Sequence, residues 1–131
     1  MDMNRYTNKA QQALVKSQSI ATDRQNNSIE PVHVLAALLM QPEGVVPEVV
    51  AKIGVRPSAL LDDVNAMIDN LPRVSGGGVQ MGLSRGTLNA LNQAERQAQQ
   101  MHDEYVSTEH VLMGLSQDKA IGDLLARHGI T

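Results

Sequence analysis

The stretch "PVHVLAALL", from Pro31 to Leu39, decides the fold, because it returns 77 residues later as "TEHVLMGLS", from Thr108 to Ser116. Both copies contain His-Val-Leu followed three residues later by a leucine. In the first copy, apolar residues cover most of the circumference of a helix, which predicts the most buried helix of the protein. A pattern that recurs at a fixed distance indicates a duplicated structural unit.

The duplication extends outward from these two stretches. A threonine and a serine, both good helix caps, stand at equivalent positions, and apolar pairs and a glycine after an apolar helix recur as well. With a two-residue deletion in the second copy, the matches are Thr7 with Ser84, Ala13-Leu14 with Ala90-Leu91, and Ile53-Gly54-Val55 with His128-Gly129-Ile130. Two such units can bury their apolar stripes against each other as a pseudo-twofold pair.

Apolar residues spaced three and four apart predict seven helices, bounded by caps and prolines. We expect them to begin after Thr7, at Pro31, at Pro47, at Pro57, after Ser84, after Ser107 and at Ile121. No segment alternates convincingly between apolar and polar residues. The predicted fold is therefore all-α, a pseudo-twofold duplication of a four-helix unit with about seven to eight helices.

The repeats divide the chain into parts of one domain, residues 1–131. We expect a first repeat at 6–71, an inter-repeat linker at 72–82 and a second repeat at 83–131. The second repeat stops where its fourth helix would begin. The expectation is that the chain was cut from a longer protein.

Composition excludes several classes of protein. The 131 residues include no cysteine, no phenylalanine, no tryptophan and only two tyrosines. The net charge is −3. Disulfides and thiolate metal sites are therefore impossible, and a nucleic-acid surface is not expected without basic runs or stacking aromatics. No apolar run is long enough for a membrane span, and no signal pattern opens the chain, so we expect no membrane contact and a cytoplasmic location.

The stretch "SGGGVQMGLS", residues 75–84, nearly matches a phosphate-binding loop, and an enzyme that binds nucleotide there is one hypothesis. Leu83 replaces the lysine of that motif, and the preceding "NLPRV" is not a buried strand. We interpret the stretch as a linker. No cofactor is predicted for this domain.

Two histidines, His33 and His110, occupy equivalent positions in the first turns of equivalent helices. A pseudo-twofold pair of histidines could hold a metal, but neither has a neighbour at a ligand spacing such as H-E-x-x-H. We interpret both as packed side chains that bond to nearby carbonyl groups, with no metal site. No nucleophile with a base and no carboxylate pair is indicated, so catalysis by this domain is not expected.

The repeated stretches, together with "IGV", "HGI" and "LPRVSGG", resemble the amino-terminal Clp repeat domain of the Clp AAA+ ATPases. The resemblance covers essentially the whole chain. "RYTNKAQQAL" and "LPRVSGG" are most similar to the ClpB branch, the protein disaggregases. The resemblance implies a mobile domain that precedes two ATPase modules in a homohexameric cytoplasmic chaperone. ATP and magnesium would belong to those modules alone.

The same resemblance implies that the domain recruits unfolded or aggregated polypeptide through a shallow apolar groove. The alternative is a domain that docks adaptor proteins for a protease-associated unfoldase such as ClpA or ClpC. The isolated domain is expected to be a monomer.

Candidate site residues follow from the family by position. Thr7, Asp103 and Glu109 match residues tied to substrate handling in the family, although an N-cap, a loop carboxylate and a first-turn carboxylate explain them equally well. Leu91, Tyr105 and Val106, with His110 alongside, are the candidates for the apolar groove.

Overall fold

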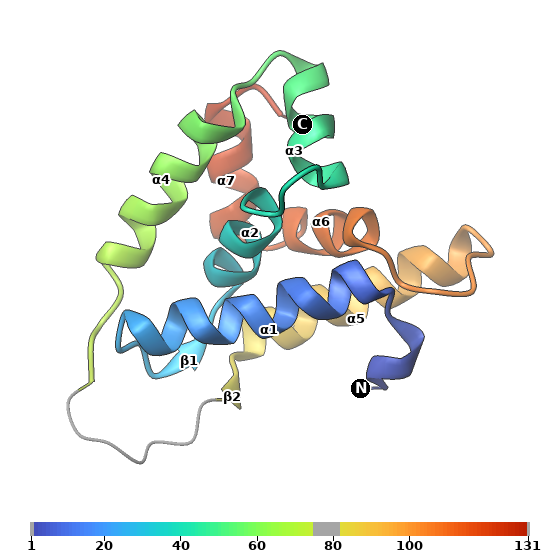
Figure 1. Cartoon of the computed structure of the whole chain (residues 1–131), viewed down its shortest axis with the longest axis horizontal. Helices are drawn as coiled ribbons and strands as arrows, with labels where there is room; N and C mark the ends of the chain where they lie inside the picture. Colours follow the sequence, from blue (N-terminus) through green and yellow to red (C-terminus); the bar gives the residue numbers. More distant parts are fainter. Residues whose placement is uncertain (1, 75–81, 131) are drawn as a thin grey trace.

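The computed structural model describes residues 2–74 and 82–130, and seven α-helices account for most of them (Figure 1). Their bounds are α1 Asn8–Asp23, α2 Pro31–Leu39, α3 Val45–Ile53, α4 Pro57–Asp69, α5 Arg85–Gln100, α6 Thr108–Ser116 and α7 Lys119–Arg127. A short 3₁₀ helix, Met3–Arg5, precedes α1. The all-α prediction is confirmed.

The two recurring stretches form the centre of the molecule, as α2 and α6. All nine residues of α2 are buried, which confirms that it is the most buried helix. Helix α2 packs against α1, α3 and α4, and α6 packs against α5 and α7. Further contacts of α2 with α5 and α6, and of α6 with α1 and α3, join the two halves into one core. Figure 1 shows α2 and α6 between the long helices α1 and α5 on one side and α3, α4 and α7 on the other.

Two very short parallel pairings connect the repeats, and the sequence did not predict them. Strand β1 (Ser28–Ile29) pairs with β2 (Gly82–Leu83), and Tyr6 forms an isolated bridge with Val106. The two pairings are equivalent, because Leu83 stands 77 residues after Tyr6 and Val106 stands 77 residues after Ile29. In each repeat, the residues just before the first helix therefore pair with a segment of the other repeat. Strands of two residues are too short to show a period of two in the sequence.

Helix ends follow the sequence closely. Thr7 and Ser84 cap α1 and α5 by accepting the N–H groups of Ala10 and Thr87. Gly54 and Gly129 follow α3 and α7 with φ of 100° and 79°, in the left-handed region where glycine is unstrained.

Two starts differ from the prediction. Helix α3 begins at Val45 rather than Pro47, which sits in the first turn where no N–H is needed. Helix α7 begins at Lys119, because the carboxylate of Asp118 accepts the N–H of Ile121 and caps the helix two residues earlier than expected.

The apolar spacing after Ser84 predicts a buried stripe on α5 made of Leu88, Leu91, Ala94, Ala98 and Met101, and this prediction is wrong at its two ends. Leu88 and Met101 are 43% and 51% exposed, whereas Ala90 and Thr87 are buried. Met101 lies just past the end of the helix, so its side chain leaves the buried face, and Leu88 lies at the edge of that face. The proposed division into repeats at 6–71 and 83–131 remains a prediction, and residues 75–81 of its linker lie outside the described residues.

Candidate functional site

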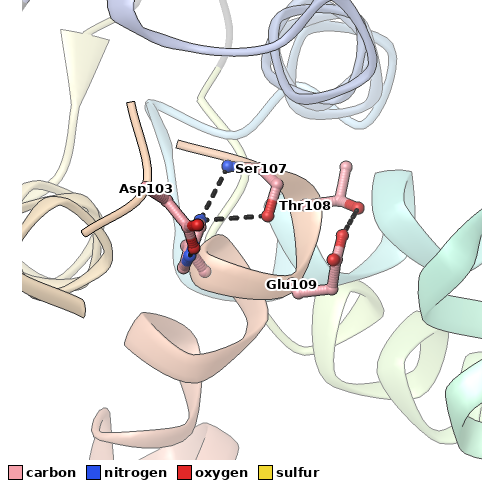
Figure 2. A network of polar contacts seen from close by, with 5 residues as sticks. Asp103, Ser107, Thr108 and Glu109 are labelled. Carbon is pink, nitrogen blue, oxygen red and sulfur yellow. Dashed lines mark hydrogen bonds and ion pairs between the residues drawn. The ribbon is translucent and has the colours of Figure 1, made fainter. Parts of the chain in front are cut away.

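His110 bonds to Ser107 and Asp103 at the start of α6 and is the centre of a polar network. Figure 2 shows this network, with Asp103, Ser107, Thr108 and Glu109 labelled. The His110 ring is 4% exposed, and its Nδ1 accepts the backbone N–H of Ser107 at 2.9 Å. The proton of the neutral ring therefore resides on Nε2, which donates to Oδ2 of Asp103 at 2.9 Å. Thr108 donates to the Glu109 carboxylate at 3.2 Å on the other side of the helix start.

His33 occupies the same position at the start of α2. Its Nδ1 accepts the N–H of Glu30 at 2.8 Å, and its Nε2 lies 2.8 Å from Oδ1 of Asn26. Burial lowers the pKa of His33, and the positive charge of Arg24 lowers it further against the opposing effect of Glu30. The prediction of a carbonyl partner holds for His33, whose Nε2 faces the side-chain carbonyl oxygen of Asn26, and is wrong for His110, whose Nε2 faces the carboxylate of Asp103. Each ring joins a helix-start N–H to a side chain seven residues earlier.

Neither histidine is part of a metal centre in the residues that the structure describes. No group of three or more His, Asp or Glu side chains in residues 2–74 and 82–130 is arranged to hold a metal ion. Most of the glycine stretch lies outside this part of the chain. Of the part described, Ser84 uses its hydroxyl to cap α5 and Leu83 pairs with Ile29, so these two residues do not fit a phosphate loop.

The loop between α5 and α6 exposes an apolar and acidic surface around the His110 network. Met101, Tyr105 and Met113 are 51%, 50% and 40% exposed, and they border a hollow of about 360 Å³. The hollow is lined by three carboxylates and by no lysine or arginine. We call this the turn surface, made of Met101, Asp103, Glu104, Tyr105, Glu109 and Met113.

Two of the predicted groove residues are core residues instead. Leu91 is 1% exposed and Val106 is 3% exposed, so neither side chain is available to a partner. Leu91 lies in the buried face of α5, and Val106 faces inward because it bridges to Tyr6. Of the apolar candidates, only Tyr105 reaches the surface.

Thr7 lies apart from the turn surface but shares a neighbour with it. Its hydroxyl caps α1, and its N–H donates to the carbonyl of Val106 at 2.9 Å. Thr7 borders a second hollow, of about 320 Å³, together with Glu109. Glu109 also borders the turn surface, so it stands between Thr7 on one side and Asp103 and Tyr105 on the other.

An apolar groove between α3, α6 and α7 was missed by sequence reasoning. It has a volume of about 410 Å³ and is lined mainly by aliphatic side chains. We call it the α6 groove, and its apolar lining residues are Val49, Val50, Ile53, Leu112, Met113, Leu125, Ala126 and Ile130. Met113 belongs to both the groove and the turn surface. The prediction missed it because α3 comes from the other repeat.

The groove-lining face of α6 and the equivalent face of α2 differ in burial. In the first repeat, α4 packs on α2 and Ala36 is buried. In the second repeat, the equivalent residue Met113 is 40% exposed. The α6 face is therefore open in the part of the chain that the structure describes.

Comparison with known proteins gives concordant results for sequence and fold. Residues 5–128 match the family model of the Clp repeat (R) N-terminal domain. The chaperone protein ClpB of Mycobacterium leprae is 38% identical over 130 residues, which are 98% of this chain and 15% of that protein. ClpB of Bacillus cereus is 33% identical over 100% of this chain and 16% of its own length.

A solved structure shows the same fold. The Hsp104 N-terminal domain from Candida albicans superimposes with a TM-score of 0.87, at 23% identity, covering 96% of this chain and 83% of that domain. The chain thus spans about 15% of the length of the curated relatives it matches. Within residues 2–74 and 82–130, no helix has the length and apolar character to cross a bilayer.

Proposed function

Because the chain belongs to the family of Clp repeat N-terminal domains, we propose that it recruits unfolded or aggregated polypeptide for a ClpB-like protein disaggregase. The observation that carries the proposal is the aliphatic lining of the α6 groove, in a chain 38% identical to a ClpB chaperone. On this proposal the domain itself performs no chemistry, and ATP hydrolysis belongs to other modules of such a chaperone.

The chemistry of the face suits a partner without a fixed sequence. Burial of any apolar side chain against the aliphatic residues of the groove is favourable, and the flexible Met113 can adapt to different shapes. A shallow groove of this kind offers few fixed polar contacts. Binding should therefore be weak and should change little with salt, because burial of apolar area is not screened.

The proposal is tested by fluorescence titration of the chain with a carboxymethylated, permanently unfolded polypeptide rich in apolar residues. The double variant Ile53→Ser and Met113→Ser removes two exposed apolar side chains from the groove. Losing them should weaken binding about tenfold, or roughly 0.7 kcal/mol for each side chain. Val15→Ser on α1 is the matched control, because Val15 is 65% exposed and lies outside the groove.

Absence of binding up to millimolar polypeptide would overturn the proposal. An equal loss of binding in Val15→Ser and in the groove variant would also contradict it, since the α6 face would then have no special part. Circular dichroism of each variant shows that its helices remain folded.

A further inference from the structure

A polar hollow lies where α5 meets the end of α6 and the start of α7, and it shares no lining residue with the turn surface. Its volume is about 370 Å³. Ala90 and Gly114 line it where the two helices approach so closely that Gly114 has no room for a Cβ atom. Four amide side chains and three charged side chains make up the rest of the lining, apart from Gly86. The hollow therefore offers hydrogen bonds and charge rather than apolar area.

The same position on the first repeat is also exposed. Val15 and Met40 stand 77 residues before Asn92 and Gln117 of the hollow. Val15 is 65% exposed and Met40 is 46% exposed, so neither α3 nor α4 covers this position in the first repeat. Exposure of the surface is thus common to both repeats, and what distinguishes the second repeat is that amides replace the apolar side chains.

Arg96 places a positive charge at one end of the hollow. The carboxylate next to it in the sequence, Glu95, accepts the hydroxyl of Tyr6 at 2.7 Å and is therefore directed toward Tyr6. Within residues 2–74 and 82–130, Arg96 takes part in no ion pair. The residues three and four positions away from Arg96 on α5, where a carboxylate could pair with it, are Asn92, Gln93, Gln99 and Gln100.

The other two charged residues lie at the opposite end of the hollow. Asp118 caps α7 by accepting the N–H of Ile121, and its second oxygen lies beside Gly86. Gly86 precedes Arg96 by ten residues, or about 15 Å of helix, which exceeds the screening length of about 8 Å at physiological salt. Lys119 pairs with Asp123 at 3.0 Å. The charge of Arg96 is therefore not compensated by Asp118.

We propose that this hollow docks an extended, acidic segment of a partner protein, with a carboxylate of the segment on Arg96. A guanidinium group binds a carboxylate through two parallel N–H donors. Each amide presents both a donor and an acceptor, which matches the N–H and C=O groups of an extended backbone. These amides are Asn89, Asn92, Gln93 and Gln117.

The dimensions of the hollow suit a short extended segment. Asn89 and Arg96 are seven residues apart on α5, or about 10 Å, which is the length of about three residues of an extended chain. The proposal is independent of the proposed function, because it concerns a surface other than the α6 groove. Of the lining residues, Gln117 alone borders both.

The test compares two fluorescein-labelled, C-terminally amidated peptides, GSAEAEASG and GSAQAQASG, by fluorescence anisotropy. The acidic peptide should bind about fivefold more tightly at low salt, the scale of one exposed ion pair, and the difference should shrink as salt is added. Amide NMR shifts should concentrate in residues 89–96 and 114–119. Equal binding of the two peptides, or shifts concentrated elsewhere, would overturn the inference.

Arg96→Gln is the variant that decides the outcome. It removes the charge but keeps a long side chain with good helix propensity, so circular dichroism should be unchanged. It should weaken binding of the acidic peptide about fivefold and leave binding of the glutamine peptide unchanged. Arg85→Gln is the matched control, because Arg85 is exposed on the same helix but does not line the hollow. Equal losses in the two variants would show a response to net charge alone and contradict the inference.

The double variant Ile53→Ser and Met113→Ser separates this inference from the proposed function. Neither residue lines the hollow, so the variant should keep acidic-peptide binding while it loses binding of the unfolded polypeptide. Loss of acidic-peptide binding in this variant would count against the inference. If the unfolded polypeptide binds but the two peptides bind alike, the inference is wrong and the proposed function stands. If the peptides behave as expected but the polypeptide does not bind, the inference stands and the proposed function fails.

Discussion

The histidine sites of the two repeats have the same hydrogen-bond pattern in different surroundings. His33 and His110 both accept an N–H at a helix start and both donate to a side chain seven residues earlier. In the first repeat the partner is the buried amide of Asn26, whereas in the second it is the half-exposed carboxylate of Asp103. The shared bonds hold the helix start in place in both repeats, and the two partner side chains differ in exposure and in charge.

The helix pair α1 and α2 also differs from the pair α5 and α6 in how closely the two helices pack. Ala37 is buried in α2, which packs against α1, and the equivalent residue of α6 is Gly114, which lies against α5. A Cβ atom on Gly114 would overlap the carbonyl oxygen of Ala90 and reach the backbone of Ala94. The second pair of helices is therefore too close for the residue that the first pair uses.

The largest loss of stability is expected when Gly114 is replaced by the alanine that the first repeat has at the equivalent position. Gly114→Ala places the alanine of the first repeat at the second crossing, where the overlap with backbone forces α5 and α6 apart. We expect a loss of about 3 kcal/mol in the free energy of unfolding, measured by urea denaturation. The reverse change, Ala37→Gly, should cost only about 1 kcal/mol, mainly through helix propensity. Equal costs for the two changes would show that the crossings do not differ.

The histidine sites should differ in their sensitivity to truncation. His33→Ala leaves the Glu30 N–H and the buried Oδ1 of Asn26 without a partner and opens a cavity, so it should cost about 2–3 kcal/mol. His110→Ala should cost about 1–2 kcal/mol, because the exposed Asp103 carboxylate can bond to water instead. Urea denaturation of both variants measures the difference, and a larger loss for His110→Ala would contradict it.

Acid should act on the first site through His33. Burial lowers the pKa of His33 in the folded state, so below about pH 6.5 the unfolded chain binds a proton that the folded chain rejects. The stability that neutral His33 contributes is fully present above the pKa of His33 in the unfolded chain. It is lost as the pH falls toward the lower pKa of His33 in the folded chain. The slope is at most about 1.4 kcal/mol per pH unit.

Denaturation midpoints between pH 7 and pH 5 measure this slope. His33→Gln retains an acceptor for the Glu30 N–H but does not titrate, so its stability should fall less over the same range. Identical slopes for the two proteins would rule out His33 as the source.

The smallest effects are expected at the helix caps. Thr7→Ala and Ser84→Ala each remove one bond from a helix-start N–H, and each should cost about 1 kcal/mol. The comparison also examines the candidate role of Thr7. If Thr7→Ala weakens polypeptide binding more than Ser84→Ala at equal stability, Thr7 contacts the partner; equal losses leave it only the capping role.

Local features of the sequence predicted the helices well. The apolar periods, the caps Thr7, Ser84 and Ser107, and the glycines after α3 and α7 act within a few residues, so their effects can be read along the chain. The duplication was visible for the same reason, since each repeat carries its own copy of these signals.

The candidate site was predicted only in part. The resemblance to the Clp repeat domain implied Asp103, Tyr105, Glu109 and His110 as candidates, and the structure places these four at one hollow. Leu91 and Val106, implied as groove residues by the same resemblance, are buried in the core, because a family position does not say whether a side chain meets protein or solvent. Exposure depends on helices that arrive from the other repeat.

The sequence by itself determined the helical units and their pairing as repeats, because periodicity and capping are encoded within each unit. Only the tertiary structure decided which copy of each feature is covered. Residues 71–74 bury Asn26, α4 buries Ala36, and the backbone of Ala90 leaves Gly114 no room for a side chain. These are contacts between separate segments of the chain, so the packing of the whole domain, and no local pattern, decides which residues reach the surface.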